Sequence, residues 1–168
     1  MNEIKGNLIT LALEGRFDVI AHGCNCFCKQ KSGIAKQMVK EFQTDTFPKE
    51  HIDLKEVINK LGTIDMEGRI ITPNDNVKNL IVVNCYTQYS YGGNHKDGVA
   101  DPFDPIAIIL CMRKLNHEFK GKHIGVPYIG CGLASPEPLR ASRKEWFERC
   151  LTDTMTDCEV TLVEYDKV

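Results

Sequence analysis

Hydrophobic and polar positions along the chain follow two spacings, one typical of strands and one typical of helices. The run Leu-Ile-Val-Val at 80–83 is typical of a strand that is buried on both faces of a sheet. Between 105 and 119, apolar residues recur three or four positions apart, which predicts a helix. The predicted strands are 3–5, 18–24, 61–66, 69–71, 79–85, 123–126 and 160–165, and the predicted helices are 9–14, 33–42, 48–59, 105–119 and 143–155.

Strands and helices that alternate in this way predict an α/β fold, in which helices cover a largely parallel sheet. Folds of this class bind ligands beyond the carboxyl ends of their strands. Two glycine-containing segments, 22–35 and 130–134, and the segment that follows the strand at 79–85 all fall at such ends. We therefore expect a ligand site at this edge of the sheet.

The two glycine-containing segments favour an anionic ligand. In 22–35 an apolar strand ends in a Cys-rich turn and a helix begins at once, so the free N–H groups of the helix start point at whatever precedes it. Gly130 and Gly132 give the second segment the freedom to press its backbone amides against a ligand. Together the segments suggest two backbone loops that close around one phosphate-bearing ligand.

Length and charge limit the class of protein. The 168 residues, 42% of them hydrophobic, are enough for one well-buried core, and we expect a single domain over 1–168. A net charge of -2 and a pI near 6.2 argue against a dedicated nucleic-acid binder. No apolar run approaches the roughly 20 residues that a membrane span needs, and the first residues lack the pattern of a signal peptide. The expected location is cytoplasmic.

Eight cysteines raise the question of disulfides or a metal site. Cys24, Cys26 and Cys28 alternate with other residue types, and the other five cysteines are scattered singly. Structural zinc sites favour ligand pairs with two to four residues between the two ligands, and a second such pair elsewhere. Only one residue separates these cysteines, so their spacing fits zinc poorly. We expect reduced thiols, most of them packed in the core, and neither a metal nor another cofactor.

Five segments carry a further signal in their order. They are Lys-Gly-Asn-Leu at 5–8, Asp-Val-Ile-Ala-His-Gly-Cys-Asn at 18–25, Ser-Gly-Ile-Ala at 32–35, Val-Asn-Cys-Tyr-Thr-Gln-Tyr at 83–89 and Val-Pro-Tyr-Ile-Gly-Cys-Gly-Leu-Ala at 126–134. Their order and approximate spacing resemble the motifs of macrodomains over nearly the whole chain. The resemblance is closest to the branch that includes ADP-ribose-1''-phosphate phosphatases and small phage or bacterial macrodomain proteins. It implies a three-layer α/β/α sandwich with a mixed, largely parallel central sheet, which binds ADP-ribose or a derivative without metal.

The resemblance also assigns roles to residues. The position of Asn25 contacts the distal ribose in macrodomains, the turn at 32–35 wraps the diphosphate, and the loop at 130–134 closes over the phosphates and the distal ribose. Asn7 stands where many macrodomains hold adenine with an Asp, and 84–93 is expected to form part of the distal site. The expected ligand-binding residues are Asn7, Leu8, Asn25, Ser32, Gly33, Ile34, Ala35, Asn84, Tyr86, Tyr89, Gly130, Cys131, Gly132, Leu133 and Ala134.

Hydrolysis of a phosphate or acyl group from the distal ribose is the expected activity, and it needs an acid–base group within hydrogen-bond reach. His22 is the first candidate, because its ring can titrate near neutral pH and it matches a histidine position of the phosphatase branch. Asn25 would orient ribose or water, and Glu145 is a second candidate acid–base group. Ala134 replaces the Asp of deglycosylating macrodomains, which disfavours that activity.

Two other functions stay open. One is a reader that binds ADP-ribose without turnover. The other is a module that binds single-stranded RNA or poly(A) through tyrosines and lysines, which the net charge disfavours. A dinucleotide oxidoreductase does not fit, because no Gly-x-Gly-x-x-Gly follows the first strand.

The second glycine loop departs from the relatives, which continue it with Gly-Gly-Asp-Trp. This chain has several more residues before Trp146. If Trp146 matches the family tryptophan, residues 135–142 are an insertion at the lip of the distal-ribose pocket, ahead of the helix predicted at 143–155.

Overall fold

The computed structural model describes residues 1–48, 57–90, 102–132 and 134–166. Its centre is a six-stranded sheet in the order β1-β6-β5-β2-β4-β3, in which β3 alone runs antiparallel to its neighbour. The sheet is therefore mixed and largely parallel, as the sequence predicts. Its strands are β1 (Asn2–Gly6), β2 (Val19–Asn25), β3 (Ile64–Ile71), β4 (Lys78–Gln88), β5 (His123–Val126) and β6 (Glu159–Tyr165).

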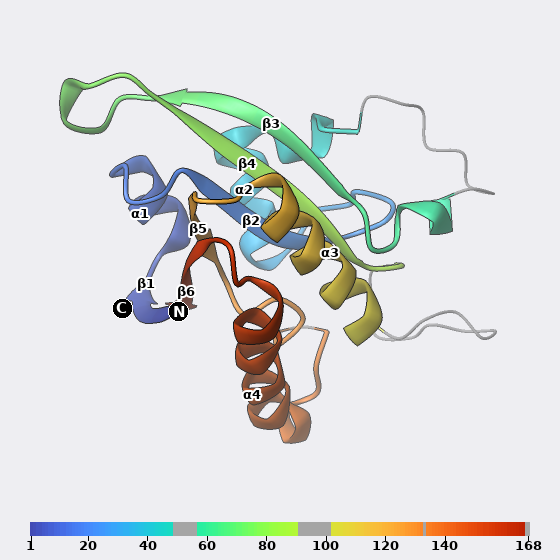
Figure 1. The fold of residues 1–168 in the computed structure, drawn as a ribbon. Helices are drawn as coiled ribbons and strands as arrows, with labels where there is room; N and C mark the ends of the chain where they lie inside the picture. Colours follow the sequence, from blue (N-terminus) through green and yellow to red (C-terminus); the bar gives the residue numbers. More distant parts are fainter. Residues whose placement is uncertain (49–56, 91–101, 133, 167–168) are drawn as a thin grey trace.

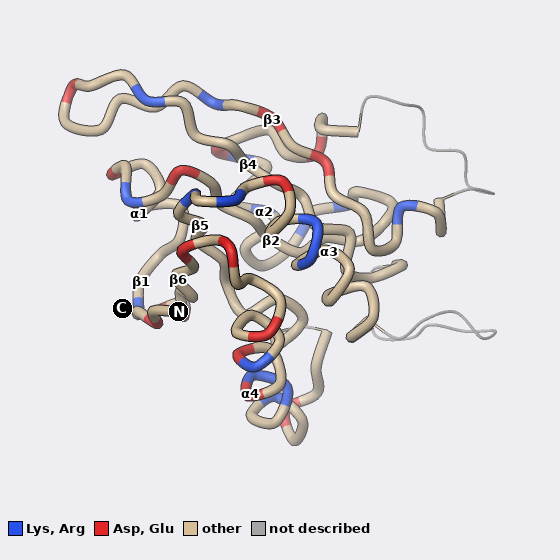
Figure 2. The backbone as a smooth tube through the Cα atoms, in the orientation of Figure 1, with Lys and Arg blue, Asp and Glu red and all other residues tan. Residues whose placement is uncertain are grey.

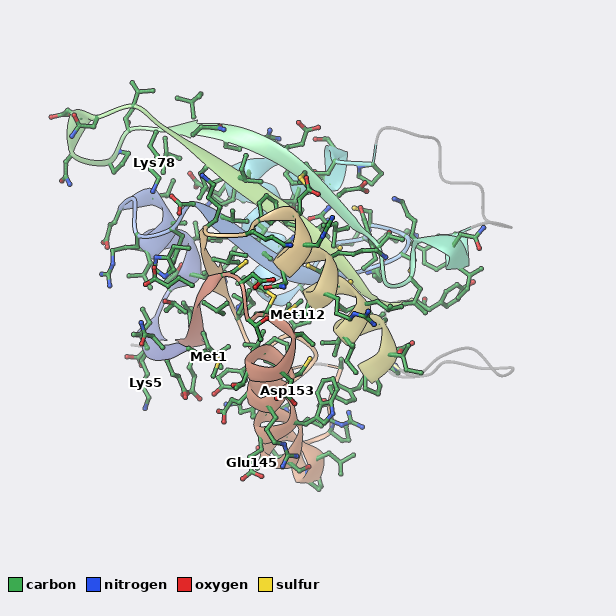
Figure 3. The ribbon with its side chains drawn as sticks, in the orientation of Figure 1. Met1, Lys5, Lys78, Met112, Glu145 and Asp153 are labelled. Carbon is green, nitrogen blue, oxygen red and sulfur yellow. The ribbon has the colours of Figure 1, made fainter. Side chains whose placement is uncertain are left out.

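Helices cover both faces of the sheet (Figure 1). The helices α1 (Leu8–Leu13) and α2 (Gly33–Phe42) pack on one face, and α3 (Pro105–Glu118) and α4 (Glu137–Thr154) pack on the other. Met112, which Figure 3 labels on α3, is fully buried in the core that α3 and α4 form with the sheet. The three-layer α/β/α sandwich is confirmed.

Two predicted boundaries are wrong. The strands predicted at 61–66 and 69–71 form one strand, β3, because Gly68 stays paired opposite Ile81 and does not interrupt the ladder. β3 lies at the edge of the sheet, where a glycine costs little packing. The last helix begins at Glu137, since Pro138 lies in its first turn, where the fixed φ of proline suits a helix and its missing N–H is not needed. Residues 137–142 are therefore helical, whereas the helix was predicted to begin at 143.

The helix predicted at 48–59 lies mostly outside the described residues. Its last part, within Val57–Lys60, is a 3₁₀ turn, and two further 3₁₀ turns occupy Thr44–Thr46 and Pro73–Asp75. In the described ranges, no helix combines the length and the apolar character that a membrane crossing requires.

Candidate functional site

Two loops meet at the carboxyl ends of the parallel strands. Loop 1 (residues 26–32) joins β2 to α2, and loop 2 (residues 127–136) joins β5 to α4; β2 lies between β5 and β4 in the sheet. Gly23, near the end of β2, allows loop 2 to lie close to the strands, because a Cβ atom there would lie 2.7 Å from Ile129 of loop 2 and 2.8 Å from Thr87 of β4. The fold thus brings together the two glycine-containing segments that the sequence predicts to share a ligand.

Asn25 braces loop 1. Its side-chain Nδ2 donates to the carbonyl oxygen of Lys29 at 2.7 Å, and its Oδ1 accepts from the N–H of Lys29 at 3.2 Å. Within the loop, the pKa of the Cys28 thiol is lowered to about 7, because Cys24 and Gln30 donate hydrogen bonds to its sulfur. The amide of Asn25 lies at the predicted site, where it fixes the shape of the loop that a ligand would meet.

The start of α2 offers free backbone donors. The first intrahelical bond runs from the Lys36 N–H to the Ser32 carbonyl at 3.3 Å, so the N–H groups of 33–35 precede it. Ser32 and Gly33 are exposed, Ile34 and Ala35 are half-buried, and the side chain of Ser32 makes no capping hydrogen bond. An anion fits such a helix start, because the N–H groups and the helix dipole both favour negative charge.

Loop 2 presents a similar set of donors. Gly130 has a left-handed φ of 77°, and Gly132 is exposed with no atom within 4 Å of the place where a Cβ would stand. The backbone N–H groups of Gly130, Gly132 and Ala134 have no acceptor among the described residues. Cys131 is 3% exposed and packs in the core, so its thiol does not reach the open surface of loop 2. Leu133 lies outside the described residues.

His22 lies in the interior, away from both loops' open surface. The alternation of β2 places it on the face that α2 covers, and the side chain is 0% exposed. Its Nε2 is 2.7 Å from Oδ1 of Asn84, and its Nδ1 has no partner in the part of the chain that the structure describes. Burial lowers the pKa of His22 to about 4. The ring is therefore neutral at physiological pH, and this geometry does not support the predicted acid–base role.

The aromatic and amide residues of β4 are also interior. Asn84 is fully buried and donates from Nδ2 to the Thr44 carbonyl at 2.8 Å. Tyr86 is fully buried too, with its hydroxyl 2.6 Å from Asp65 and the Lys60 ammonium 4.4 Å from its ring centroid. Asn84 and Tyr86 thus lie in the interior, where their hydrogen bonds join β4 to the Thr44 carbonyl and to Asp65.

Three other predicted residues have mixed positions. Tyr89 is half-buried and stands edge-on to Phe27 in loop 1, at a centroid distance of 5.4 Å. Asn7 caps α1, since its Oδ1 accepts from the N–H groups of residues 9 and 10, and Leu8, the first residue of that helix, is buried. Glu145 is exposed on α4 (Figure 3).

The described residues hold no group of three or more His, Cys, Asp or Glu side chains arranged to bind a metal ion. Seven of the eight cysteines are buried, and all eight are free thiols. The prediction that most cysteines pack in the core is confirmed.

No family model matches the chain. A protein of Enterobacteria phage T4, the uncharacterized 17.5 kDa protein of the tk-vs intergenic region, is 32% identical over 138 residues, which cover 77% of this chain and 77% of that one. The chain belongs to the same family as this phage protein.

Solved macrodomains share the fold. The macrodomain of Thermus aquaticus DarG superposes with a TM-score of 0.59 at 15% identity, and the match covers 96% of each chain. Thermosipho africanus DarTG, solved in complex with ADP-ribose, superposes with a TM-score of 0.62 at 17% identity over 98% of this chain and 42% of that one. This chain therefore has the macrodomain fold.

Sequence reasoning missed the polar residues that hold loop 2 in place. Ser135 is 1% exposed, and its hydroxyl donates to the Gly130 carbonyl at 2.6 Å. Arg140 and Arg143, one helical turn apart on α4, both bond to Ser135. The sequence does contain a signal for this contact. A proline in the first turn predicts the helix start, and arginines three positions apart lie on one face of that helix, next to the preceding loop. This signal was missed because the helix was predicted to begin only at 143.

Proposed function

We propose that the protein binds ADP-ribose or a derivative of it at the carboxyl ends of β2, β4 and β5. The observation that carries the proposal is that loop 2 and the start of α2, which follows loop 1, both have backbone N–H groups that lack acceptors among the described residues. Such groups bind phosphate oxygens without any charged side chain. The shared fold of a DarTG structure solved with ADP-ribose supports the choice of ligand.

In this proposal the diphosphate lies between the start of α2 and loop 2. The N–H groups of 33–35 hold it from one side, and those of Gly130, Gly132 and Ala134 hold it from the other. The adenosine would lie toward Asn7 and Leu8, after β1, and the distal ribose toward Asn25 and Tyr89. A cytoplasmic location, where such ligands arise, is part of the same proposal.

Hydrolysis of a phosphate or acyl group on the distal ribose is a second candidate. The free amides of loop 2 favour it, because donors fixed around a phosphate can also stabilise charge that develops during its transfer. His22, the acid–base candidate for this reaction, is buried, and burial lowers its pKa to about 4. Release of free phosphate from ADP-ribose-1''-phosphate, followed with and without the protein, separates this candidate from a reader.

ADP-ribose at a hundred times its dissociation constant should stabilise the fold by about 2.7 kcal/mol. For a chain of this size, that raises the melting temperature by about 5 to 10 °C. Adenosine at the same concentration should give a far smaller shift, because it lacks the phosphates that both loops are built to hold. Thermal unfolding with ADP-ribose, adenosine and poly(A) RNA measures the three cases. If adenosine raises the melting temperature as much as ADP-ribose does, the loops do not bind the phosphates. If only poly(A) raises it, the RNA-binding alternative is favoured.

A further inference from the structure

The outer edge of β3 has backbone groups that are open for pairing. β3 is the last strand of the sheet (Figure 1), and it is paired on one side only, with β4. The Tyr86 N–H donates to the carbonyl of Thr63 opposite it, so residues with odd numbers in β3 bond to β4 and those with even numbers face outward. Among the described residues, the outward groups have one partner, since the Gly68 carbonyl accepts from Nη1 of Arg69 at 3.0 Å. The outward residues are Ile64, Met66, Gly68 and Ile70.

A groove lies beside this edge, on the side of α3. Its volume is about 690 Å³, within the range of ligand sites in proteins. Ile64 and Met66 of β3 and Leu110 of α3 line it with apolar surface. Strand alternation turns the outward residues of β3 to this same side, where Ile70 is 69% exposed. The strip carries no charge on the α3 side, although a charge there is a common protection of strand edges against pairing.

The helix side of the groove is basic. Arg113, Lys114, His117 and Glu118 line it, and Figure 2 shows the basic residues of α3 in blue. Neither Arg113 nor Lys114 has an ion-pair partner in the part of the chain that the structure describes. Lys114 donates to the Gly62 carbonyl at 2.7 Å, which leaves its charge unbalanced. The positive charges of Arg113 and Lys114 therefore exceed that of the one carboxylate in the groove, which suits an acidic partner.

We propose that β3 and this groove form a docking surface for an acidic segment of another protein, which pairs with β3 as an extra strand. Addition of a strand at an open edge is a recurring mode of peptide recognition. Backbone hydrogen bonds supply its affinity, and alternate side chains supply its specificity. Partner residues opposite Ile64 and Met66 turn their side chains to the α3 side, so carboxylates at these positions meet the charges of Arg113 and Lys114. The inference does not depend on ADP-ribose binding.

A second copy of this chain fits the surface less well. In a pair of β3 strands, each copy would bring its own Arg113 and Lys114 to the same side of the joined sheet. The residues that a second β3 turns to that side are isoleucine, methionine and glycine, so they provide no carboxylate to balance the cations. The charges thus favour an acidic partner over self-association.

Fluorescence anisotropy with labelled synthetic peptides tests the inference. One peptide alternates glutamate with threonine over about eight residues, the length of β3, and the control peptide has lysine in place of glutamate. The glutamate peptide should bind about tenfold more tightly than the lysine peptide, because only its charges complement the groove. The double variant Arg113→Gln, Lys114→Gln should remove most of this difference. Arg149→Gln is the control for charge, because Arg149 is exposed on α4, and it should leave the difference unchanged.

A proline at the edge tests the pairing with β3. Ile70→Pro removes an outward N–H at a position where an edge strand tolerates proline, and its ring obstructs the added strand. Ile70→Thr is the matched control, since it shortens the same exposed side chain and keeps the N–H. Ile70→Pro should weaken binding of the glutamate peptide by about tenfold, and Ile70→Thr by about twofold or less. Both proteins should keep a melting temperature near that of wild type, because the side chain of Ile70 is largely exposed.

Three results would contradict the inference. If both peptides bind equally, or the glutamate peptide does not bind, the groove does not select an acidic strand. If Ile70→Pro binds the glutamate peptide as well as Ile70→Thr does, the peptide does not pair with β3. If sedimentation shows that the protein without peptide is a dimer and that Ile70→Pro is a monomer, the edge binds a second copy of this chain and not an acidic partner.

Discussion

Acidification from pH 6.5 to pH 4 is expected to lower the free energy of unfolding by about 3 kcal/mol, because the folded protein holds His22 neutral in its interior. The pKa of His22 is about 4 in the folded protein, against 6.5 for an unperturbed histidine. Each unit is worth about 1.4 kcal/mol. Between the two values the unfolded chain binds a proton that the folded chain does not. Stability is therefore full above pH 6.5 and is lost as the pH falls toward 4.

Other groups act mainly outside this window. Hydrogen bonds lower the pKa values of Asp18 and Glu164, so their stabilisation is lost at the acidic end. The lowered pKa of Cys28 affects stability at and above pH 7. The slope between pH 6.5 and about 4.5 is thus assigned to His22.

Urea unfolding at several pH values between 4.5 and 7.5 measures that slope. His22→Gln should flatten it, whereas His117→Gln should leave it unchanged, because His117 is exposed on α3. A wild-type profile without the slope would show that His22 is hydrated or protonated in the folded protein. In that case the acid–base role predicted from the sequence would regain its physical basis.

The layers of the fold could be predicted from the sequence because the apolar pattern is regular. The run at 80–83 is buried on both faces, as its continuous hydrophobicity indicates, and the helix spacing at 105–119 matches α3 almost to the residue. Parallel strands then require a shared edge for their carboxyl ends, which is why loops 1 and 2 meet. Each of these steps needs only local pattern and general rules of connection.

The depth of His22 could not be predicted in the same way. The sequence around a histidine at the end of a strand is the same whether its side chain faces solvent or the interior. Here the side chain is buried by residues from distant parts of the chain. Asn84 and the Thr44 carbonyl complete the polar chain around the ring, and they lie 62 and 22 positions away in the sequence. Asn25 shows the same limit, because its hydrogen bonds to Lys29 depend on a loop conformation that no periodicity encodes.

Gly132→Val should abolish measurable ADP-ribose binding and leave the fold intact. A Cβ at Gly132 meets no atom within 4 Å, and the residue does not have a left-handed φ, so the free protein accommodates the larger side chain. In the proposed complex the same space holds the phosphates, and the valine would separate them from the loop's N–H groups. Loss of two charge-assisted hydrogen bonds weakens binding by about a hundredfold or more. Calorimetry measures the affinity, and thermal unfolding without ligand checks the fold.

The choice of glycine decides how clearly this result can be interpreted. Gly33 also has open space around it, but its φ of 59° is strained for any branched residue, so Gly33→Val would lower both stability and binding. Gly121→Val is the control for position. Gly121 has a similar left-handed φ of 78°, but it lies just before the amino end of β5, away from the carboxyl ends of the strands. This variant should lower the melting temperature and keep the ADP-ribose affinity. Normal binding by a well-folded Gly132→Val protein would mean that loop 2 is a plain turn and that the phosphates lie elsewhere.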